Sequence, residues 1–366
     1  MAKKLRVGIL FGGRSGEHEV SLLSAASILK AIDREKFEVV PIGINKAGHW
    51  LTGGAAQGLL EGAAPEPADA PTQPQELTLS NSTPLGAQAL DIVFPVLHGT
   101  FGEDGTIQGL FELAGIAYVG SGVLGSAAGM DKDVMKRLFA QAGLPIVKHL
   151  SLLRADWEKS PRKSIAQIEA ALKYPVFVKP ANLGSSVGIS KVHDRSELGP
   201  ALTEAAKYDR KLVIEQGVGG KKAKARELEV AVLGNDDPKA SVAGEIIPDK
   251  EFYDYEAKYL SDGSIPVIPA KLTSKETKTI QQMAVAAFRA CDLSGLARVD
   301  FLMEPDGKRR IFLNEVNTLP GFTQISMYPK LWQASGLSYK DLITRLIELA
   351  LERHAEKSRT TYSREE

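Results

Sequence analysis

The feature that most constrains the fold is an alternation of short apolar runs with segments of helical periodicity in the first third of the chain. Residues 5–11 form an apolar run that ends at two glycines, and apolar side chains then recur at helical spacing over residues 20–32. Further strands are predicted at 37–44, 91–97 and 117–119, and a further helix at 106–113. Strands that alternate with helices favour a parallel sheet with helical crossovers. The first part of the chain is therefore predicted to be an open α/β domain.

The composition changes between residues 51 and 90, where Ala, Gly, Pro, Gln and Thr predominate and five of the 19 prolines lie. Periodicity is lost over these residues, so we expect them to form an excursion on the surface. A helix predicted at 131–142 follows, and Gly143 and Pro145 end it. We place the first domain boundary just before this helix.

The pattern changes to paired strands after residue 172. Strands predicted at 176–179 and 189–192 enclose a loop of glycine and serine residues. The remaining predicted elements are helices at 196–206, 274–291 and 339–354, strands at 212–215, 228–233 and 240–246, and a hairpin at 297–316. At ~150 residues per domain, 366 residues suffice for two or three domains. We divide them into an N-terminal α/β domain (1–129), a central α+β unit (130–215) and a C-terminal unit (216–366).

The charge balance limits the kinds of molecule that the protein is expected to bind. The 45 Lys and Arg residues equal the 45 Asp and Glu residues in number, which excludes the broad basic surface of a dedicated nucleic-acid binder. No apolar run approaches the ~18 residues of a membrane span, and the first apolar run is too short for a secretion signal. The single cysteine, Cys291, is expected to be a buried thiol. We therefore expect a cytoplasmic protein that binds small molecules and neither nucleic acid nor membrane.

The loop at 180–188 carries the strongest chemical signal. Walker loops and Rossmann turns lead into a helix, whereas predicted strands flank this loop on both sides. Its glycines allow backbone N–H groups to close on phosphate oxygens, Ser185 and Ser186 add hydroxyl donors, and Lys179 adds a positive charge. We interpret the loop as a phosphate-binding flap; the alternative is a plain hairpin with a flexible tip.

A second signal lies in the predicted hairpin. Glu315 and Asn317 are two residues apart and share a face of one strand, and Asp300 precedes them on the other strand. Carboxylate and amide oxygens without His or Cys suit Mg²⁺ better than zinc. The turn signal at 304–307 places Asp300 about four residues, or roughly 13 Å, from Glu315 along the strands. Either the loop is longer than this turn or two metal ions span the gap; the alternative is a salt-bridged hairpin face.

Other segments point to the same site. A Pro-Gly turn offers the N–H of Gly321 to a developing oxyanion, together with Arg298. Residues 12–21 and 98–105 follow predicted parallel strands and so open onto one crevice beyond the strand ends. Residues 252–259 carry aromatic and charged side chains without periodicity, and we interpret them as a lid that excludes water from a substrate. The alternative for the Pro-Gly turn is an ordinary turn without a catalytic role. For residues 12–21 and 98–105 it is helix caps, and for residues 252–259 it is a surface loop.

Six motifs, in this order along the chain, resemble those of the D-alanine–D-alanine ligases of the ATP-grasp superfamily. They are GGRSGEHEVS (12–21), HGTFGEDG (98–105), MDKDVMKR (130–137), KPANLGSSVG (179–188), FYDYEAKY (252–259) and NEVNTLPGF (314–322). The resemblance extends over nearly the whole chain, and six motifs together are far more specific than any one of them.

The resemblance implies an ATP-grasp fold preceded by an N-terminal open α/β domain, with ATP between the central and C-terminal units. It implies an enzyme that ligates two D-alanine molecules to D-alanyl-D-alanine through an acyl phosphate, releases ADP and phosphate, and serves peptidoglycan precursor synthesis. It further implies ATP and two Mg²⁺ ions as cofactors, with Mn²⁺ as an alternative ion. A homodimer is the expected assembly.

The resemblance also implies roles for individual residues through their motif positions. The residues expected to bind the nucleotide are Lys132, Lys179, Ser185, Ser186, Glu215, Val218, Glu227 and Lys258. Those expected to act in catalysis are Glu17, Ser185, Tyr259, Arg298, Gly321 and Ser326. Those expected to hold the D-alanine substrates are His98, Lys258, Ser326 and Met327. The metal ligands are expected to be Asp300, Glu315 and Asn317.

The chain departs from the family pattern at residues 219–226, which form a longer segment than usual, so Glu229 is an alternative to Glu227 as the ribose ligand. Two other functions stay open. A ligase of D-alanine and D-lactate is disfavoured by Tyr259 in the lid motif. A nucleotide-binding regulator without turnover is disfavoured because such a protein has no need of the metal-binding residues.

Overall fold

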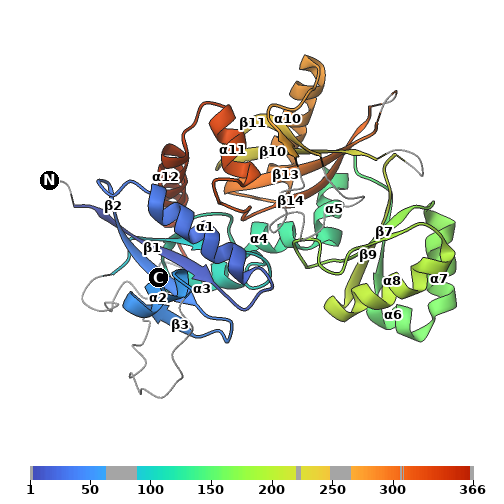
Figure 1. Cartoon of the computed structure of the whole chain (residues 1–366), viewed down its shortest axis with the longest axis horizontal. Helices are drawn as coiled ribbons and strands as arrows, with labels where there is room; N and C mark the ends of the chain where they lie inside the picture. The colour runs from blue at the N-terminus through green and yellow to red at the C-terminus, as the bar shows by residue number, and fades with distance from the viewer. Residues whose placement is uncertain are drawn as a thin grey trace.

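The computed structural model describes residues 3–62, 89–219, 224–247, 265–305, 307 and 309–362. These residues form three β-sheets, two of five strands and one of four (Figure 1). Figure 1 shows the N-terminal sheet at one end of the long axis and the central sheet, in green, at the other. Among the described residues, no helix combines the length and the apolar character required to cross a membrane.

The N-terminal sheet has the strand order β3-β2-β1-β4-β5. Its strands are β1 (Leu5–Gly12), β2 (Phe37–Ile44), β3 (Trp50–Thr52), β4 (Ile92–Val96) and β5 (Ala117–Tyr118), and its helices are α1 (His18–Ala31), α2 (Gly53–Leu60) and α3 (Thr106–Ala114). β1 pairs in parallel with β2 and β4, whereas the edge strand β3 is antiparallel. Val7, Ile9 and Leu10 in β1 are completely buried, as is typical of a central parallel strand covered on both faces. The predicted open α/β sheet is confirmed.

The prediction of an irregular surface excursion at 51–90 is wrong for residues 51–60. β3 ends and α2 begins there, and Ala56 of α2 is completely buried. Leu59 and Leu60 pack against the N-terminal core. A helix this short shows little periodicity in its sequence, and it is tertiary packing that stabilises it. Residues 63–88 lie outside the described residues.

The central sheet is antiparallel and has the strand order β6-β9-β7-β8. Its strands are β6 (His149–Leu153), β7 (Val176–Pro180), β8 (Ser190–Val192) and β9 (Lys211–Gln216), and its helices are α6 (Arg154–Lys159), α7 (Pro161–Ala171) and α8 (Arg195–Tyr208). Val178, Leu202 and Ile214 are completely buried in a core of their own. The sequence predicts β7, β8, α8 and β9, but not β6, α6 or α7.

The C-terminal sheet has the strand order β12-β11-β10-β13-β14 and is antiparallel. Its strands are β10 (Arg226–Gly234), β11 (Lys239–Ile247), β12 (Ile265–Val267), β13 (Gly295–Met303) and β14 (Ile311–Asn317), and its helices are α10 (Ser274–Ala290), α11 (Met327–Ala334) and α12 (Tyr339–Lys357). α10 buries Phe288 in the core that also holds Cys291, whose thiol is buried as predicted. α11 and α12 pack with the N-terminal sheet in a shared core, which joins these two units.

Helices α4 (Val123–Met130) and α5 (Lys132–Gln141) lie between the sheets (Figure 1). The side chain of Asp131 caps α5, because it accepts hydrogen bonds from the N–H groups of Asp133 and Val134 at 3.0 and 3.1 Å. Met135 and Phe139 of α5 are buried in the core of the C-terminal sheet. α5 is thus attached to that sheet by apolar packing, while its polar side chains reach the central sheet.

Candidate active site

A cavity of about 320 Å³ is lined by residues from all three sheet units. The N-terminal unit contributes Glu103, the loop between β7 and β8 contributes Ser185, and the C-terminal sheet contributes Arg298, Glu315 and Asn317. Ser185 and Asn317 therefore share one cavity although they are 132 positions apart in the chain. The flap and the hairpin can belong to one site only if they border the same cavity, and they do.

Strands β13 and β14 bring the predicted metal-binding side chains next to one another. In their antiparallel register Asp300 pairs with Glu315, and Arg298 pairs with Asn317. The separation of roughly 13 Å that the turn signal implies between Asp300 and Glu315 is therefore wrong, and of the two alternatives left open the longer loop is confirmed. The connection spans residues 304–310 and the register shifts between Asp300 and Phe301, so the hairpin is longer than the turn signal indicates.

The carboxylates of this hairpin face cationic side chains. Arg298 donates two hydrogen bonds to Asp300, from Nε to Oδ1 at 2.8 Å and from Nη2 to Oδ2 at 2.7 Å. Nζ of Lys132 lies 3.8 Å from Oε2 of Glu315. Together with the amide of Asn317, the two carboxylates form a set of hard oxygen donors, which fits Mg²⁺ or a similar divalent cation. Such a cation would compete with Arg298 for Asp300.

Lys136, Lys179 and Glu215 form what we call the buried lysine cluster. Nζ of Lys136 lies 2.7 Å from Oε1 of Glu215, and Nζ of Lys179 lies 2.7 Å from Oε2. Burial by itself raises the pKa of Glu215, but the two ammonium groups outweigh burial and hold this pKa well below its usual range. Glu215 is therefore ionised at neutral pH, and the cluster holds two lysines for one carboxylate.

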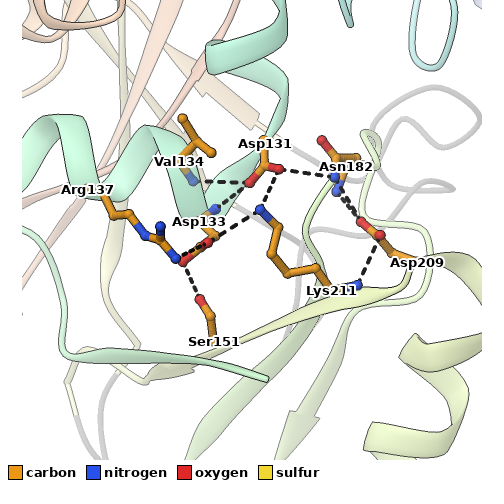
Figure 2. Close-up of polar contacts among 8 residues, drawn as sticks. All are labelled: Asp131, Asp133, Val134, Arg137, Ser151, Asn182, Asp209 and Lys211. Atoms are coloured by element: carbon orange, nitrogen blue, oxygen red, sulfur yellow. Dashed lines mark hydrogen bonds and ion pairs between the residues drawn. The ribbon is translucent and has the colours of Figure 1, made fainter. Parts of the chain in front are cut away.

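A second set of charged residues, which we call the flap-root cluster, holds the first residues of the flap (Figure 2). It consists of Asp131, which caps α5, Asp133 and Arg137 within α5, Ser151 of β6, Asn182 of the flap, Asp209 just before β9, and Lys211, the first residue of β9. Nζ of Lys211 lies 2.6 Å from Asp131 and 3.3 Å from Asp133. Asn182 donates its backbone N–H to Asp209 at 2.7 Å and its side-chain amide to Asp131 at 3.3 Å (Figure 2).

Lys132 fastens the same segment to α5. Its backbone N–H donates to the carbonyl of Ala181 at 3.0 Å, and its Nζ donates to the carbonyl of Leu183 at 2.8 Å. The N–H of Ala181 in turn donates to the carbonyl of Lys211 at 3.0 Å. The flap therefore leaves the central sheet from a position that is tied to α5, and through α5 to the C-terminal core.

The tip of the flap reaches the N-terminal unit. The hydroxyl of Ser185 donates a hydrogen bond to Oε1 of Glu17. Ser185 and Ser186 have φ angles of 50° and 61°, in the left-handed region that residues other than glycine seldom adopt. Of the predicted set of Glu17, Ser185 and Tyr259, the first two are in contact. Tyr259 lies outside the described residues, as does Lys258.

His98 is buried and is not among the residues that line the cavity. Its Nδ1 lies 2.9 Å from the carbonyl oxygen of Leu319, which can only accept, so Nδ1 carries a proton. Burial lowers the pKa of His98 more than the nearby Glu17 raises it, so the ring is neutral and Nε2 accepts from the hydroxyl of Ser24 at 3.1 Å. The imidazole thus holds α1 against the turn that precedes Gly321. A contact between His98 and a substrate stays a prediction.

The turn that contains Gly321 borders the cavity. Gly321, Ser326 and Met327 all line it. Oγ of Ser326 accepts a hydrogen bond from the N–H of Thr323 at 3.0 Å and lies 3.1 Å from where a Cβ on residue 321 would stand. A side chain at position 321 would therefore meet Ser326 at a tight distance, and Ser326 would have to shift by a few tenths of an ångström.

The residues predicted to hold the nucleoside come from two strands. Glu215 is in β9, and Val218 lies in the segment just after it. Glu229 of β10 is buried, lines the cavity and has its Oε2 3.3 Å from Nε of Arg298. Burial lowers the pKa of Lys179, but the charges of Glu215, Glu315 and Glu227 raise it overall. Both candidates for the ribose ligand therefore stay open.

Glu103 and Lys136 are not among the residues predicted from the sequence. Glu103 lines the cavity, and burial, together with the charge of Glu17, raises the pKa of Glu103 well above its ordinary value. It lies in the motif HGTFGEDG, which was assigned to the site only through His98. Lys136 follows Lys132 by four residues on α5, and this helical spacing is a signal that both lysines lie on one face.

Comparison with known protein families and sequences gives a consistent result. Family models described as D-ala D-ala ligase N-terminus and D-ala D-ala ligase C-terminus match residues 6–121 and 138–348. A D-alanine–D-alanine ligase of Bacillus cytotoxicus is 50% identical, and the match covers 98% of this chain and 99% of that protein. A D-alanine–D-alanine ligase of Geobacillus thermodenitrificans is 51% identical with the same coverage, 98% and 99%.

Solved structures agree with the sequence relatives. The D-alanine–D-alanine ligase from Coxiella burnetii matches with a TM-score of 0.80 at 37% identity, over 98% of this chain and 97% of that one. The VanG D-Ala:D-Ser ligase from Enterococcus faecalis matches with a TM-score of 0.81 at 36% identity, over 95% of this chain and 100% of that one. The similarity therefore extends through all three sheet units.

Proposed function

The chain belongs to the D-alanine–D-alanine ligase family and has its ATP-grasp fold with a preceding N-terminal domain, and from this premise we propose that it joins two D-alanine molecules in an ATP-dependent reaction. The observation that carries the proposal is the single cavity shared by Ser185 of the flap, Lys132 of α5, and Glu315 and Asn317 of the hairpin. Donors for phosphate and oxygen ligands for a cation thereby face one space.

The reaction needs an activated acyl group because a free carboxylate is a poor acyl donor. The carboxylate of the first D-alanine attacks the γ-phosphorus of ATP, which forms an acyl phosphate and releases ADP. The amine of the second D-alanine then attacks the acyl carbon and loses a proton. The tetrahedral oxyanion collapses, the C–O bond to phosphate breaks, and D-alanyl-D-alanine and inorganic phosphate are formed.

Phosphate binding is assigned to lysines and the flap. Lys132, Lys179 and Lys258 would neutralise charge on the phosphates, and Ser185 and Ser186 would donate to their oxygens. Divalent cations, two Mg²⁺ or alternatively Mn²⁺, held by Asp300, Glu315 and Asn317, would neutralise the charge that develops on the transferred phosphoryl group. The adjacent position of these three side chains in β13 and β14 supports that assignment.

The remaining residues are assigned to the nucleoside and the amino acids. Glu215 and the backbone near Val218 would bind adenine, and Glu227, or alternatively Glu229, would bind ribose. Arg298 and the N–H of Gly321 would hold the oxyanion, and both line the cavity. The D-alanine substrates would be held by His98, Ser326 and Met327.

Closure of the flap and the lid would protect the acyl phosphate. Water that reached this intermediate would hydrolyse it and waste ATP, so the site must exclude solvent before the amine attacks. The hydrogen bond between Ser185 and Glu17 supports a closed flap, and Tyr259 of the lid would complete this set. A cytoplasmic homodimer that supplies peptidoglycan synthesis is the setting that we propose for the enzyme.

The test is phosphate release with ATP and Mg²⁺ in the presence of D-alanine or L-alanine, with the dipeptide detected by mass spectrometry. We expect turnover with the D-isomer alone and a loss of at least ~100-fold in Glu315→Gln. D-Lactate as a competing second substrate tests the depsipeptide alternative. Absence of phosphate release and dipeptide from a protein that still binds ATP would favour the regulator instead.

A further inference from the structure

Lys136 is a completely buried lysine for which the proposed reaction has no use. It projects from α5, whose neighbouring residues Met135 and Phe139 are in the apolar core of the C-terminal sheet. Besides its ion pair with Glu215, its Nζ donates a hydrogen bond to the carbonyl of Asn314 at 3.1 Å. A buried ammonium group is costly unless it is paired, so its retention calls for a physical reason.

The geometry of Glu215 indicates that reason. Lys136 occupies one carboxylate oxygen and Lys179 the other, each at 2.7 Å. Among the described residues, Glu215 is the one acidic side chain in ion-pair contact with Lys179. Lys136 is held by Asn314 as well as by Glu215, whereas Lys179 stands in β7 just before the flap. Of the two lysines, Lys179 is therefore the one that can move.

We propose that Lys136 is a positioning residue: it is the permanent counterion of Glu215, and it frees Lys179 to leave that carboxylate for the phosphates of a bound nucleotide. The inference rests on the proposed function. It adds the residue that keeps Glu215 paired while Lys179 contacts the phosphates. Without Lys136, the departure of Lys179 would leave an ionised carboxylate buried with no cation. That penalty would weaken the binding of phosphate-bearing nucleotides specifically.

The test is a double-mutant cycle read by calorimetric binding of two ligands, a non-hydrolysable ATP analogue with Mg²⁺, and adenosine. The proteins are wild type, Lys136→Met, Glu215→Gln and the double variant. Lys136→Met should weaken the triphosphate at least about tenfold and adenosine less than about threefold, because adenosine does not draw Lys179 away. In the double variant the buried lysine cluster has lost its carboxylate, so triphosphate affinity should lie within about threefold of Glu215→Gln alone.

Three results would overturn the inference: unchanged triphosphate binding in Lys136→Met, equal losses for the triphosphate and adenosine, or a double variant whose loss is the product of the two single losses. Equal losses would indicate a merely structural role for Lys136. Should Lys136→Met not fold, the cycle is run with Lys136→Gln, a neutral side chain that retains a donor for Asn314 and Glu215. If the wild-type protein bound no nucleotide, the proposed function itself would be refuted. That result differs from the three above, in which wild type binds nucleotide normally.

Discussion

Two clusters of charged side chains join α5 to the central sheet, and they differ in charge balance and in burial. The flap-root cluster contains three carboxylates, from Asp131, Asp133 and Asp209, and two cations, from Lys211 and Arg137. The buried lysine cluster contains two cations and one carboxylate. The first has a surplus of negative charge beside the flap, and the second has a surplus of positive charge where phosphate is proposed to bind.

This difference in charge indicates which contacts persist when a phosphate-bearing ligand binds. A cluster with surplus carboxylates offers nothing to an incoming anion, so its contacts hold the flap root in place throughout the reaction. A buried cluster with surplus ammonium groups attracts an anion strongly because little water screens it. α5 can therefore anchor the flap through Asp131 and Asp133 at its start. One turn further along, its Lys136 keeps Glu215 paired when Lys179 moves.

Removing the shared anion should have the largest effect on stability. Glu215→Gln leaves Lys136 and Lys179 buried side by side without a carboxylate, which should lower the free energy of unfolding by about 3–5 kcal/mol. Urea unfolding measures the change. The matched control is Glu204→Gln, whose pair with Lys207 is exposed to solvent and should contribute far less to stability. Equal losses in the two variants would contradict the comparison.

The same substitution should change the response to acid. The pKa of Glu215 in the folded protein lies below the ordinary value of 4.5, so its ionisation stabilises the fold above that pH, and the contribution is lost as the pH falls through the folded-state pKa. Wild type should therefore lose more stability than Glu215→Gln as the pH decreases from about 5 to about 3. Urea unfolding at several pH values measures both slopes, and parallel slopes would contradict the expectation.

Removing the ammonium group of Lys179, the lysine proposed to leave Glu215 for phosphate, should affect activity more than folding. Lys179→Met should lower ligation by about 100- to 1,000-fold, the range expected when one donor to a developing charge is lost. Its stability should fall by less than that of Glu215→Gln, because Glu215 keeps Lys136. Phosphate release and urea unfolding on the same preparation test both parts. A variant as unstable as Glu215→Gln would show that both lysines are structural.

Loosening the flap root should have the smallest effect. Lys211→Met removes the contacts to Asp131 and Asp133, which should slow dipeptide formation by less than about tenfold and let more water reach the acyl phosphate. The measurement is the ratio of phosphate released to dipeptide formed, which should rise above one. Lys207→Met on the exposed face of α8 is the control and should leave the ratio unchanged. A slower variant with an unaltered ratio would mean that Lys211 does not control flap closure.

Much of the fold was accessible from local patterns. Alternating apolar runs and helical spacing predict the parallel N-terminal strands, and glycines mark the flap between β7 and β8. Short elements such as α2 and α6 were missed, because a few turns of helix are stabilised by the cores they pack into. The sequence left the register of β13 and β14 undecided between a longer loop and a metal-spanned gap, because the bulge and the long connection that bring Asp300 beside Glu315 leave no clear signal in the turn residues.

Local sequence is enough to identify the residue types available to the site: lysines at the start of α5 and the end of β7, hydroxyls in the flap, and oxygen donors in the hairpin. The tertiary structure alone decided which of them meet. Ser185 and Glu17 are 168 positions apart, and Lys136 reaches Glu215 from a different element. Such pairs depend on how separate sheets and helices pack, and the spacing of residues along one chain segment contains no information about that packing.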